Sequence, residues 1–451
     1  MKPISTDLQR LQHGPILSTL LRLAVPNVLA LVMQVLVGIT ETYYIGRLGT
    51  TPLAAIALVF PFAMLTQMMS SGAMGGAVSS AISRALGASN TERANTLAVH
   101  AIIIGATAGT LYTVIFLLFG PVFYQWLGGQ GAVLAEAARY SNVLFCGALL
   151  LWLSNTLASI LRGTGNMLIP SFGIFATALL QILLGGMLGL GLGPVPSFGM
   201  VGVAMGHILA TAVCVLFFFW YLRSGKGRLT LGWRGIVFYR EMFFDILRVG
   251  AVACLSPVQS VLAVLIFTGL IARLGVFPLA GYGIGQRLEF LLIPISFGIG
   301  VASVPMVGMA IGAGNIARAR KVAWTAGCVS AVNLALIGGL FAIAPDLWGP
   351  LFTSDEQVLT YARQYLRIVG PAFPFFGFGL TLYFASQGSG KVLGPVLAGT
   401  LRLILVGGVG AWLSLNGATA ADFFWLVAFA MFVYGISTGG AIKFTRWGRV
   451  G

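Results

Sequence analysis

The chain has 451 residues and a formal net charge of +15; 58% of its residues are hydrophobic and only 8% are charged. Soluble domains carry roughly 25% charged residues, so this composition excludes an ordinary soluble fold. The basic residues lie in loops between apolar runs and not on one polar face, which argues against nucleic-acid binding and instead indicates orientation in a membrane.

Long, unbroken apolar runs predict an all-α integral membrane fold with twelve transmembrane helices. Each run is long enough for the roughly 20 residues that a helix needs to cross the hydrocarbon core. The runs are continuous and do not alternate in polarity, which excludes a transmembrane β-barrel. The expected spans are residues 16–45, 53–82, 97–119, 134–161, 168–191, 199–222, 243–271, 279–311, 322–345, 357–386, 393–415 and 422–441.

The two halves of the chain repeat each other in one register. Gly46–Ala54 recurs as Ala272–Ala280, and Arg162–Pro170 recurs as Gln387–Pro395, about 225 residues further on. A duplicated six-span unit with both ends on one side predicts two lobes of the same topology, with substrate between them. The predicted domains are an N-lobe at residues 1–222, a cytoplasmic linker at 223–242 and a C-lobe at 243–451.

The loop charges predict the orientation. Lys and Arg concentrate at both ends of the chain, in the linker and in the loops after even-numbered spans, so we expect both termini to be cytoplasmic. Few basic residues are expected on the opposite side, which holds the acids. That side is predicted to carry Asp346, Asp355, Glu356 and Asp422, against only Arg47 and Arg273.

Two of the 11 acidic residues stand inside predicted spans: Glu41 and Glu289. A carboxylate in hydrocarbon costs at least about 2.5 kcal/mol and must face a cavity or a partner. Asn27, Gln34 and Glu41 are spaced by seven and form one polar stripe on the first span. Pro26 predicts a kink or a freed carbonyl in that helix. Glu41 is therefore a candidate for reversible proton binding, and the alternative is an acid that only anchors the outer end of the span.

Glu289 shares one helix face with Gln286 and Tyr282, at i−3 and i−7. A functional acid on this face is one interpretation. The other is a structural ion pair with Arg287 or with Arg402, because a buried arginine needs a carboxylate.

The two acids are not repeat-equivalent. By the repeat register, Glu41 maps to Phe267 and Glu289 maps to Met64. The duplicated scaffold is therefore expected to carry different chemistry in its two lobes.

Other polar residues within spans are weaker candidates. Asn155, Gln181 and Gln259 are each as suited to joining helices as to binding a ligand. His100 and His207 are single histidines without metal-ligand spacing and are interpreted as packing. Two glycine-rich strings that resemble nucleotide-binding motifs stand in the wrong context, and no metalloprotease or serine-hydrolase motif occurs in the sequence. We therefore expect neither an enzyme nor a metal site.

Four motifs, in order and in register, resemble the multidrug and toxic compound extrusion (MATE) family. They are Glu41–Gly49 at the end of span 1, Arg162–Asn166 after span 4, Gln286–Glu289 in span 8 and Gly312–Asn315 after it. The resemblance covers the whole chain. It implies a bacterial inner-membrane exporter of small organic, often cationic or amphiphilic, compounds, which acts as a monomer by alternating access of two lobes. The implied coupling ion is H⁺ or Na⁺, with no cofactor.

Within the family the chain resembles the DinF-like branch more than the NorM-like branch. In the DinF-like branch an acid in span 1 is the coupling site, and Glu41 falls there as Glu where Asp is usual. Asn155 and Gln181 match polar positions of that branch, with Gln181 where Asn is expected and Gly185 where Asp is expected. The NorM-like branch carries an acid in span 7, where this chain offers Gln259. A single N-lobe carboxylate favours H⁺ over Na⁺, which prefers several oxygen ligands.

We expect protonation of Glu41 to bend span 1 near Pro26 and expel the substrate. One alternative is a flippase for a lipid-linked precursor, which predicts more cavity-facing basic residues than Arg287 and Arg402. The second is a Na⁺-coupled antiporter of the same family. A major-facilitator carrier is disfavoured because its loop motif after span 2 is missing, and a passive scaffold is disfavoured by the polar stripe.

Overall fold

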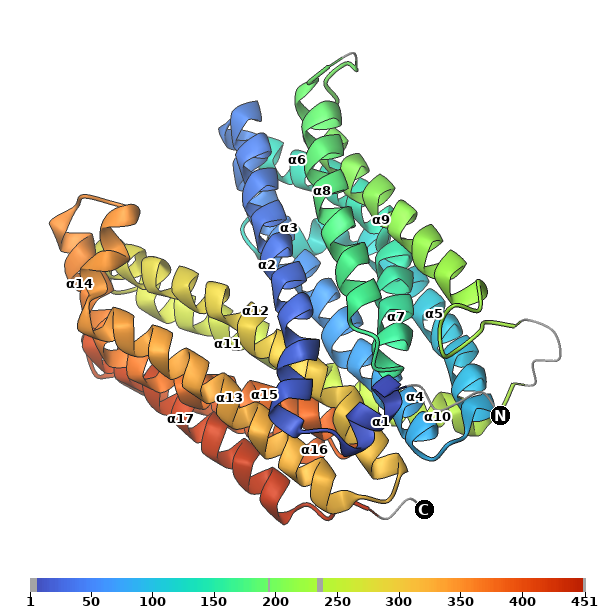
Figure 1. Cartoon of the computed structure of the whole chain (residues 1–451). Helices are drawn as coiled ribbons and strands as arrows, with labels where there is room; N and C mark the ends of the chain where they lie inside the picture. The colour runs from blue at the N-terminus through green and yellow to red at the C-terminus, as the bar shows by residue number, and fades with distance from the viewer. Residues whose placement is uncertain (1–5, 194, 233–237, 449–451) are drawn as a thin grey trace. The chain divides into compact units, whose positions relative to one another are not determined.

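The computed structural model describes residues 6–193, 195–232 and 238–448, and every regular element in these ranges is a helix (Figure 1). Four short 3₁₀ or π segments interrupt or connect the α-helices: Met68–Met74 (π), Pro345–Leu347, Gly349–Leu351 and Gly370–Ala372. The α-helices are α1 (Thr6–His13), α2 (Ile16–Leu48), α3 (Thr50–Gln67), α4 (Gly75–Gly87), α5 (Thr91–Trp126), α6 (Gly131–Cys146), α7 (Ala148–Gly163), α8 (Leu168–Leu190), α9 (Gly199–Arg223), α10 (Arg240–Ala253), α11 (Leu255–Ala272), α12 (Val276–Gly312), α13 (Ile316–Ile343), α14 (Glu356–Val369), α15 (Phe373–Ser389), α16 (Leu393–Leu415) and α17 (Ala420–Phe444).

The described helices account for all twelve predicted spans. Eleven of them, some built from two consecutive helices, are long and apolar enough to cross a membrane. The twelfth is the pair α6 and α7, which is bent by 43° at Gly147. Several observed helices extend beyond the predicted apolar runs, as α2 does to Leu48 and α5 does from Thr91 to Trp126. Helix α1 was not predicted, since its residues are mostly polar.

The chain forms two compact units that are not simple halves of the sequence. Unit 1 comprises residues 1–28 and 251–451, and unit 2 comprises residues 29–250. Helix α2 therefore belongs to both units and stays helical through Pro26, two residues before the change. The predicted lobe boundaries at 222 and 243 stay a prediction, and residues 233–237 of the predicted linker lie outside the described residues.

The described part of the predicted linker is held on unit 2 by hydrogen bonds. The backbone N–H of Tyr239 donates to Nε2 of the buried His100 (3.1 Å), whose Nδ1 donates to the Thr96 carbonyl (2.8 Å). The backbone N–H of Thr230 donates to Oδ1 of Asn95 (3.2 Å). His100 thus fastens the linker to α5, which gives this histidine a structural role.

The 225-residue register governs packing as well as sequence. A Cβ added to Gly75 of α4 would lie 2.5 Å from Oγ of Ser159 of α7. A Cβ added to Gly300 of α12 would lie 2.6 Å from Cδ2 of Phe384 of α15, and both residues stand 225 positions further on. The same close helix contact is therefore built twice, once in each unit.

At a second pair of positions the two units exchange large and small residues. In unit 2, Gly109 of α5 accommodates Trp152 of α7, whose Cβ lies 3.1 Å from the Cβ position of that glycine. In unit 1 the equivalent residues are Leu334 of α13 and Gly377 of α15. Cδ2 of Leu334 lies 2.7 Å from the Cβ position of Gly377 and so fills the space beside this glycine. In both units a large side chain therefore packs on a glycine, but it comes from opposite partners of the helix pair, as close packing permits.

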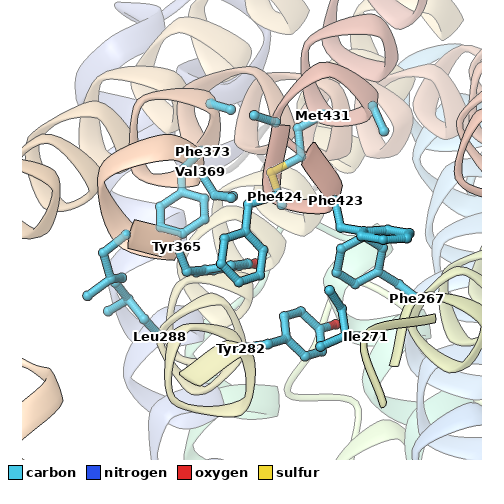
Figure 2. Close-up of a cluster of buried hydrophobic side chains, with 14 of the residues drawn as sticks. Phe267, Ile271, Tyr282, Leu288, Tyr365, Val369, Phe373, Phe423, Phe424 and Met431 are labelled. Atoms are coloured by element: carbon cyan, nitrogen blue, oxygen red, sulfur yellow. The ribbon is translucent and has the colours of Figure 1, made fainter. Parts of the chain in front are cut away.

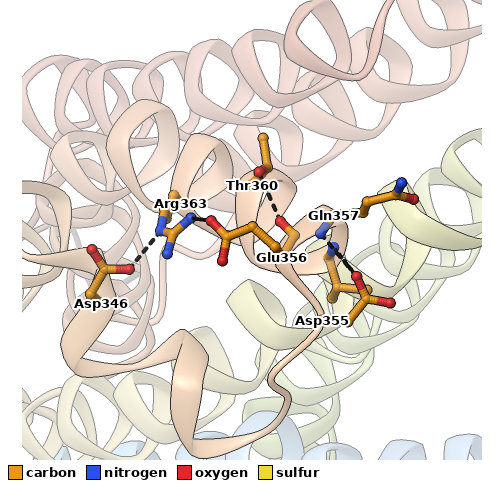
Figure 3. A network of polar contacts seen from close by, with 7 residues as sticks. Asp346, Asp355, Glu356, Gln357, Thr360 and Arg363 are labelled. Carbon is orange, nitrogen blue, oxygen red and sulfur yellow. Dashed lines mark hydrogen bonds and ion pairs between the residues drawn. The ribbon is translucent and has the colours of Figure 1, made fainter.

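Acidic residues between α13 and α14 of unit 1 are partly neutralised within their own network (Figure 3). Arg363 of α14 forms ion pairs with Asp346, at 2.6 Å, and with Glu356. Asp355 caps α14 by accepting from the N–H groups of Gln357 and Val358. The prediction that only Arg47 and Arg273 accompany these acidic residues was therefore wrong, because Arg363 pairs with two of them.

Glycine pairs bring α8 and α9 of unit 2 into backbone contact. Gly185 and Gly189 of α8 are four residues apart, as are Gly202 and Gly206 of α9, and this spacing is typical of close helix crossings in membranes. A Cβ on Gly206 would lie 2.6 Å from the backbone nitrogen of Gly185. The two helices therefore lie side by side along their length (Figure 1).

A side chain at this crossing should force the two helices apart. We expect Gly206→Val to lower the free energy of unfolding by about 1–3 kcal/mol, because the backbone of α8 cannot move away cheaply. Thermal unfolding of the detergent-solubilised protein measures the effect. Gly407→Val in α16 is the matched control, since nothing lies within 4 Å of its Cβ position. Equal losses from the two variants would contradict the packing argument.

Candidate functional site

Three helices of unit 2 bring Glu41, Gln181 and His207 together. Nε2 of Gln181 on α8 donates to Oε1 of Glu41 on α2 at 2.6 Å, and the same nitrogen lies at hydrogen-bonding distance from Nδ1 of His207 on α9. His207 Nδ1 and Glu41 Oε1 are 3.9 Å apart. The side chain of Glu41 is 14% exposed and that of His207 is 28% exposed. We call these three residues the carboxyl–amide–imidazole site.

The local sequence explains how α2 and α8 present this site. Ile45 is completely buried in an apolar cluster of unit 2, which fixes the last turn of α2. One residue earlier, the Tyr44 hydroxyl donates to the carbonyl of Ile182 at 3.3 Å. The ring of Tyr44 lies 3.8 Å from the Cβ position of Gly185, so it occupies the space that a larger residue there would need. The glycine contacts between α8 and α9 then bring Gln181 close to His207.

The electrostatics of the site leave the Glu41 carboxylate without a permanent countercharge. Within the described residues no lysine or arginine nitrogen lies within 4.0 Å of it, and His207 is its only ion-pair neighbour by that distance. A carboxylate among apolar helices is costly unless it is paired or protonated. The arrangement can therefore bind and release one proton, with Gln181 holding the carboxyl group in place.

His207 is the site residue that the sequence interpretation missed. It was assigned to packing because it has no metal-ligand spacing. The signal that could have found it is its place in the middle of an apolar span, since an ionisable side chain within a membrane segment is a functional candidate by default. That rule was applied to Glu41 and not to His207.

The remaining residues of the predicted N-lobe site lie elsewhere. Nδ2 of Asn155 on α7 donates to Oγ of Ser70 (2.8 Å) and to Oε1 of Gln67 (3.2 Å), which joins α7 to the π segment. Asn27 donates to the carbonyl of Gly298 in unit 1 (3.3 Å). Gln34 has no hydrogen-bond partner among the described residues. The polar stripe on the first span therefore does not act as one group in this structure.

In unit 1, Glu289 of α12 accepts a hydrogen bond from the hydroxyl of Tyr365 on α14. Gln286 donates through Nε2 to the hydroxyl of Tyr282 at 2.9 Å, and the rings of Tyr282 and Tyr365 meet edge to face with centroids 5.6 Å apart. Figure 2 shows both tyrosines in the aromatic cluster of this unit. The structure thus brings together three of the predicted residues and adds Tyr365.

Neither arginine considered for Glu289 forms an ion pair with it in the described part of the chain. The Arg287 guanidinium lies over the ring of Phe352, 4.9 Å from its centroid. The Arg402 guanidinium lies over the ring of Phe376 at 5.2 Å. Each cation lies over an aromatic face, and neither has a nitrogen within 4.0 Å of the Glu289 carboxyl group.

Gln259 lies apart from the other polar residues of unit 1. Its Nε2 donates to Oγ1 of Thr400 at 2.8 Å and so joins α11 to α16. This contact has the form expected of a polar residue that holds two membrane helices together.

A duplicated bundle of membrane-spanning helices with a partnered carboxyl group inside each unit defines a membrane transporter and not an enzyme. The chain belongs to the MatE family, because the family model MatE matches residues 26–187 and again residues 253–413. The two matches also account for the internal repeat.

Curated relatives cover most of the chain at low identity. "Multidrug export protein MepA" of Staphylococcus aureus is 24% identical over 412 residues, which is 90% of each chain. "Probable multidrug resistance protein NorM" of Thermotoga maritima is 25% identical over 392 residues, 84% of this chain and 81% of the relative. "FAD transporter" of Shewanella oneidensis is 23% identical over 400 residues, 89% and 88% of the two chains.

Solved structures share the fold. A MOP superfamily transporter from Pyrococcus furiosus superposes with a TM-score of 0.90 at 24% identity, over 98% of this chain and 100% of that one. A MATE structure described as the bent conformation superposes with a TM-score of 0.89 at 24% identity, over 97% of each chain. The all-helical membrane fold is therefore the MATE fold, as predicted.

Removing the hydroxyl of the buried Tyr365 should leave the half-buried carboxyl group of Glu289 without its hydrogen bond. We expect Tyr365→Phe to lower the free energy of unfolding by about 1–3 kcal/mol, the cost of an unsatisfied buried polar group. Tyr43→Phe is the matched control, because Tyr43 is exposed and has no hydrogen bond among the described residues. The unfolding temperature in detergent reports both, and an unchanged value for Tyr365→Phe would contradict the assigned contact.

Proposed function

We propose that the protein exports small organic cations or amphiphiles by antiport with H⁺, and that Glu41 is the coupling residue. The observation that carries this proposal is the carboxyl–amide–imidazole site, in which a largely enclosed carboxyl group, 14% exposed, has no permanent countercharge. Two of the relatives are named for multidrug export or resistance, which supports drug-like substrates. A third is named as an FAD transporter, so the identity of the substrate is left open.

The atoms around Glu41 favour H⁺ over Na⁺ as the coupling ion. Its carboxyl oxygen faces the amide nitrogen of Gln181, which is a hydrogen-bond donor and repels a cation. The next neighbour is a ring nitrogen of His207. Hard cations such as Na⁺ prefer several oxygen ligands, whereas a proton needs only one carboxylate oxygen.

Helix α2 is suited to transmit protonation of Glu41. Pro26 removes one backbone donor from the helix, which weakens it at that point. We propose that the neutral acid releases α2 from Gln181 and lets it bend near Pro26, which expels the substrate. The existence of a family structure described as the bent conformation is in keeping with this step.

The remaining predictions extend the same proposal. The protein is placed in the bacterial cytoplasmic membrane with both termini cytoplasmic, acts as a monomer and is assigned to the DinF-like branch. MepA and NorM match at similar identity, so the branch rests on Glu41, Asn155 and Gln181 and on Gln259 where the NorM-like branch carries an acid. In unit 1 we propose that the face of Glu289, Gln286 and Tyr282 contacts the cationic part of the substrate.

The test replaces Glu41 with its neutral isostere. Protein reconstituted in liposomes should expel the lipophilic cation tetraphenylphosphonium under a pH gradient, and Glu41→Gln should lower that flux at least tenfold because it removes the exchangeable proton. Glu136→Gln is the matched control, since Glu136 pairs with the exposed Arg139 in the same unit at 3.4 Å. It should transport as the native protein does.

Separate gradients distinguish the coupling ions. A sodium gradient at equal pH should drive no efflux if H⁺ is the coupling ion. Efflux driven by sodium alone, or unchanged efflux by Glu41→Gln, would overturn the proposal. Scrambling of lipid-linked precursors without tetraphenylphosphonium transport would instead support the flippase alternative.

A further inference from the structure

The side-chain amide of Gln181 lies between the carboxyl group of Glu41 and the imidazole of His207, two groups that can each gain, lose or move a hydrogen. Its Nε2 reaches both Oε1 of Glu41 and Nδ1 of His207. An amide nitrogen carries two hydrogens, so both can be used at once, one on each acceptor. This pattern requires a carboxylate at Glu41 and a neutral His207 whose hydrogen is on Nε2.

The opposite orientation of the same amide fits the protonated site equally well. With the amide turned by half a rotation, its oxygen would stand where the nitrogen stands now. It would accept from the O–H of a protonated Glu41 and from an N–H at Nδ1 of a neutral His207, because a carbonyl oxygen has two lone pairs. The added proton resides on Glu41, while His207 moves its own hydrogen from Nε2 to Nδ1. No charge is left buried in this state.

We propose that Gln181 and His207 form a polar switch that sets the protonation of Glu41, with the amide turning when the acid gains its proton. His207 is a positioning residue in this scheme. When Glu41 is a carboxylate, His207 accepts the second amide hydrogen of Gln181. When Glu41 is protonated, His207 donates to the amide oxygen. The inference rests on the proposed function and deepens it by naming the groups that determine when Glu41 loads.

The surroundings contain few other groups that could set the protonation of this site. Helices α6, α7 and α8 pack against α9. Helix α8 carries no titratable side chain, and Arg162 stands in the last turn of α7, whereas His207 is in the first half of α9. The other titratable or charged groups on α6 and α9 are Glu136, Arg139, Tyr140 and Cys146 on α6, and Cys214, Tyr221 and Arg223 on α9. On α2, the helix of Glu41, they are Arg22, Tyr43, Tyr44 and Arg47.

The sign of each substitution follows from counting hydrogen bonds. In His207→Leu, one amide hydrogen of Gln181 has no acceptor when Glu41 is ionised. When Glu41 is protonated, the amide oxygen of Gln181 still accepts from its O–H group. The charged state is therefore destabilised more, and Glu41 should hold its proton to a pH about one unit higher. Gln181→Leu removes a charge-assisted bond from the carboxylate and should shift the midpoint in the same direction by at least as much.

The experiment titrates Glu41 directly by infrared difference spectroscopy of the full-length protein in liposomes. The carbonyl band of the protonated acid is assigned as the one that Glu41→Gln removes. His207→Asn should restore the native midpoint, because the amide of asparagine can both accept and donate. Thr211→Val is the control on the same helix, since its hydroxyl bonds only to the His207 backbone carbonyl.

The outcomes separate this inference from the proposed function. Alkaline shifts in His207→Leu and Gln181→Leu, with native midpoints in His207→Asn and Thr211→Val, support the switch whether or not tetraphenylphosphonium is the substrate. Midpoints within about 0.3 pH unit of the native value in both leucine variants would overturn it. Native transport by Glu41→Gln would instead overturn the proposed function and leave the titration interpretable. A circular-dichroism spectrum of each variant shows that it has folded.

Discussion

The hydrogen bond from Gln181 to Glu41 is the contact on which the site depends. It joins α2, which belongs to both compact units, to α8 within unit 2. A carboxylate among apolar helices would otherwise be destabilised by several kcal/mol, on the order of the cost of inserting a charged side chain into the membrane. The amide offsets part of that cost without supplying a fixed positive charge. The carboxyl group is therefore stable enough to persist and still free to be neutralised by a proton.

The scaffold of the protein is symmetric, whereas its chemistry is not. Gly75 and Gly300 make the same close contact in their respective units, and the family model matches each half. The acids within the spans, in contrast, come from non-equivalent helices, Glu41 from α2 and Glu289 from α12. Gene duplication preserves packing because each unit must fill the same volume. Polar groups are not constrained in this way, so each unit could acquire an acid of its own.

The sequence allowed the spans and the repeat to be predicted, because length, polarity and periodicity are local properties of the chain. It did not locate the bend at Gly147, where a Cβ would meet Ile208, or the change of unit after Val28, since both depend on contacts between distant residues. The family resemblance named Glu41 and Gln181 as residues of one predicted site, whereas the hydrogen bond between them is known only from the structure. The partner of Glu289 did not, because Tyr365 lies 76 residues further along the chain.

Gly185, where the family resemblance implies an acid, lies one turn beyond Gln181 at the crossing of α8 and α9. Without an acid at that position of α8, the ring of Tyr44 fills the space beside the glycine. The missing side chain of Gly206 lets α9 approach the backbone of Gly185, because a Cβ there would lie 2.6 Å from the Gly185 nitrogen. His207 is the next residue along α9. The close crossing of the two helices thus brings an imidazole from α9 to the same amide that holds Glu41.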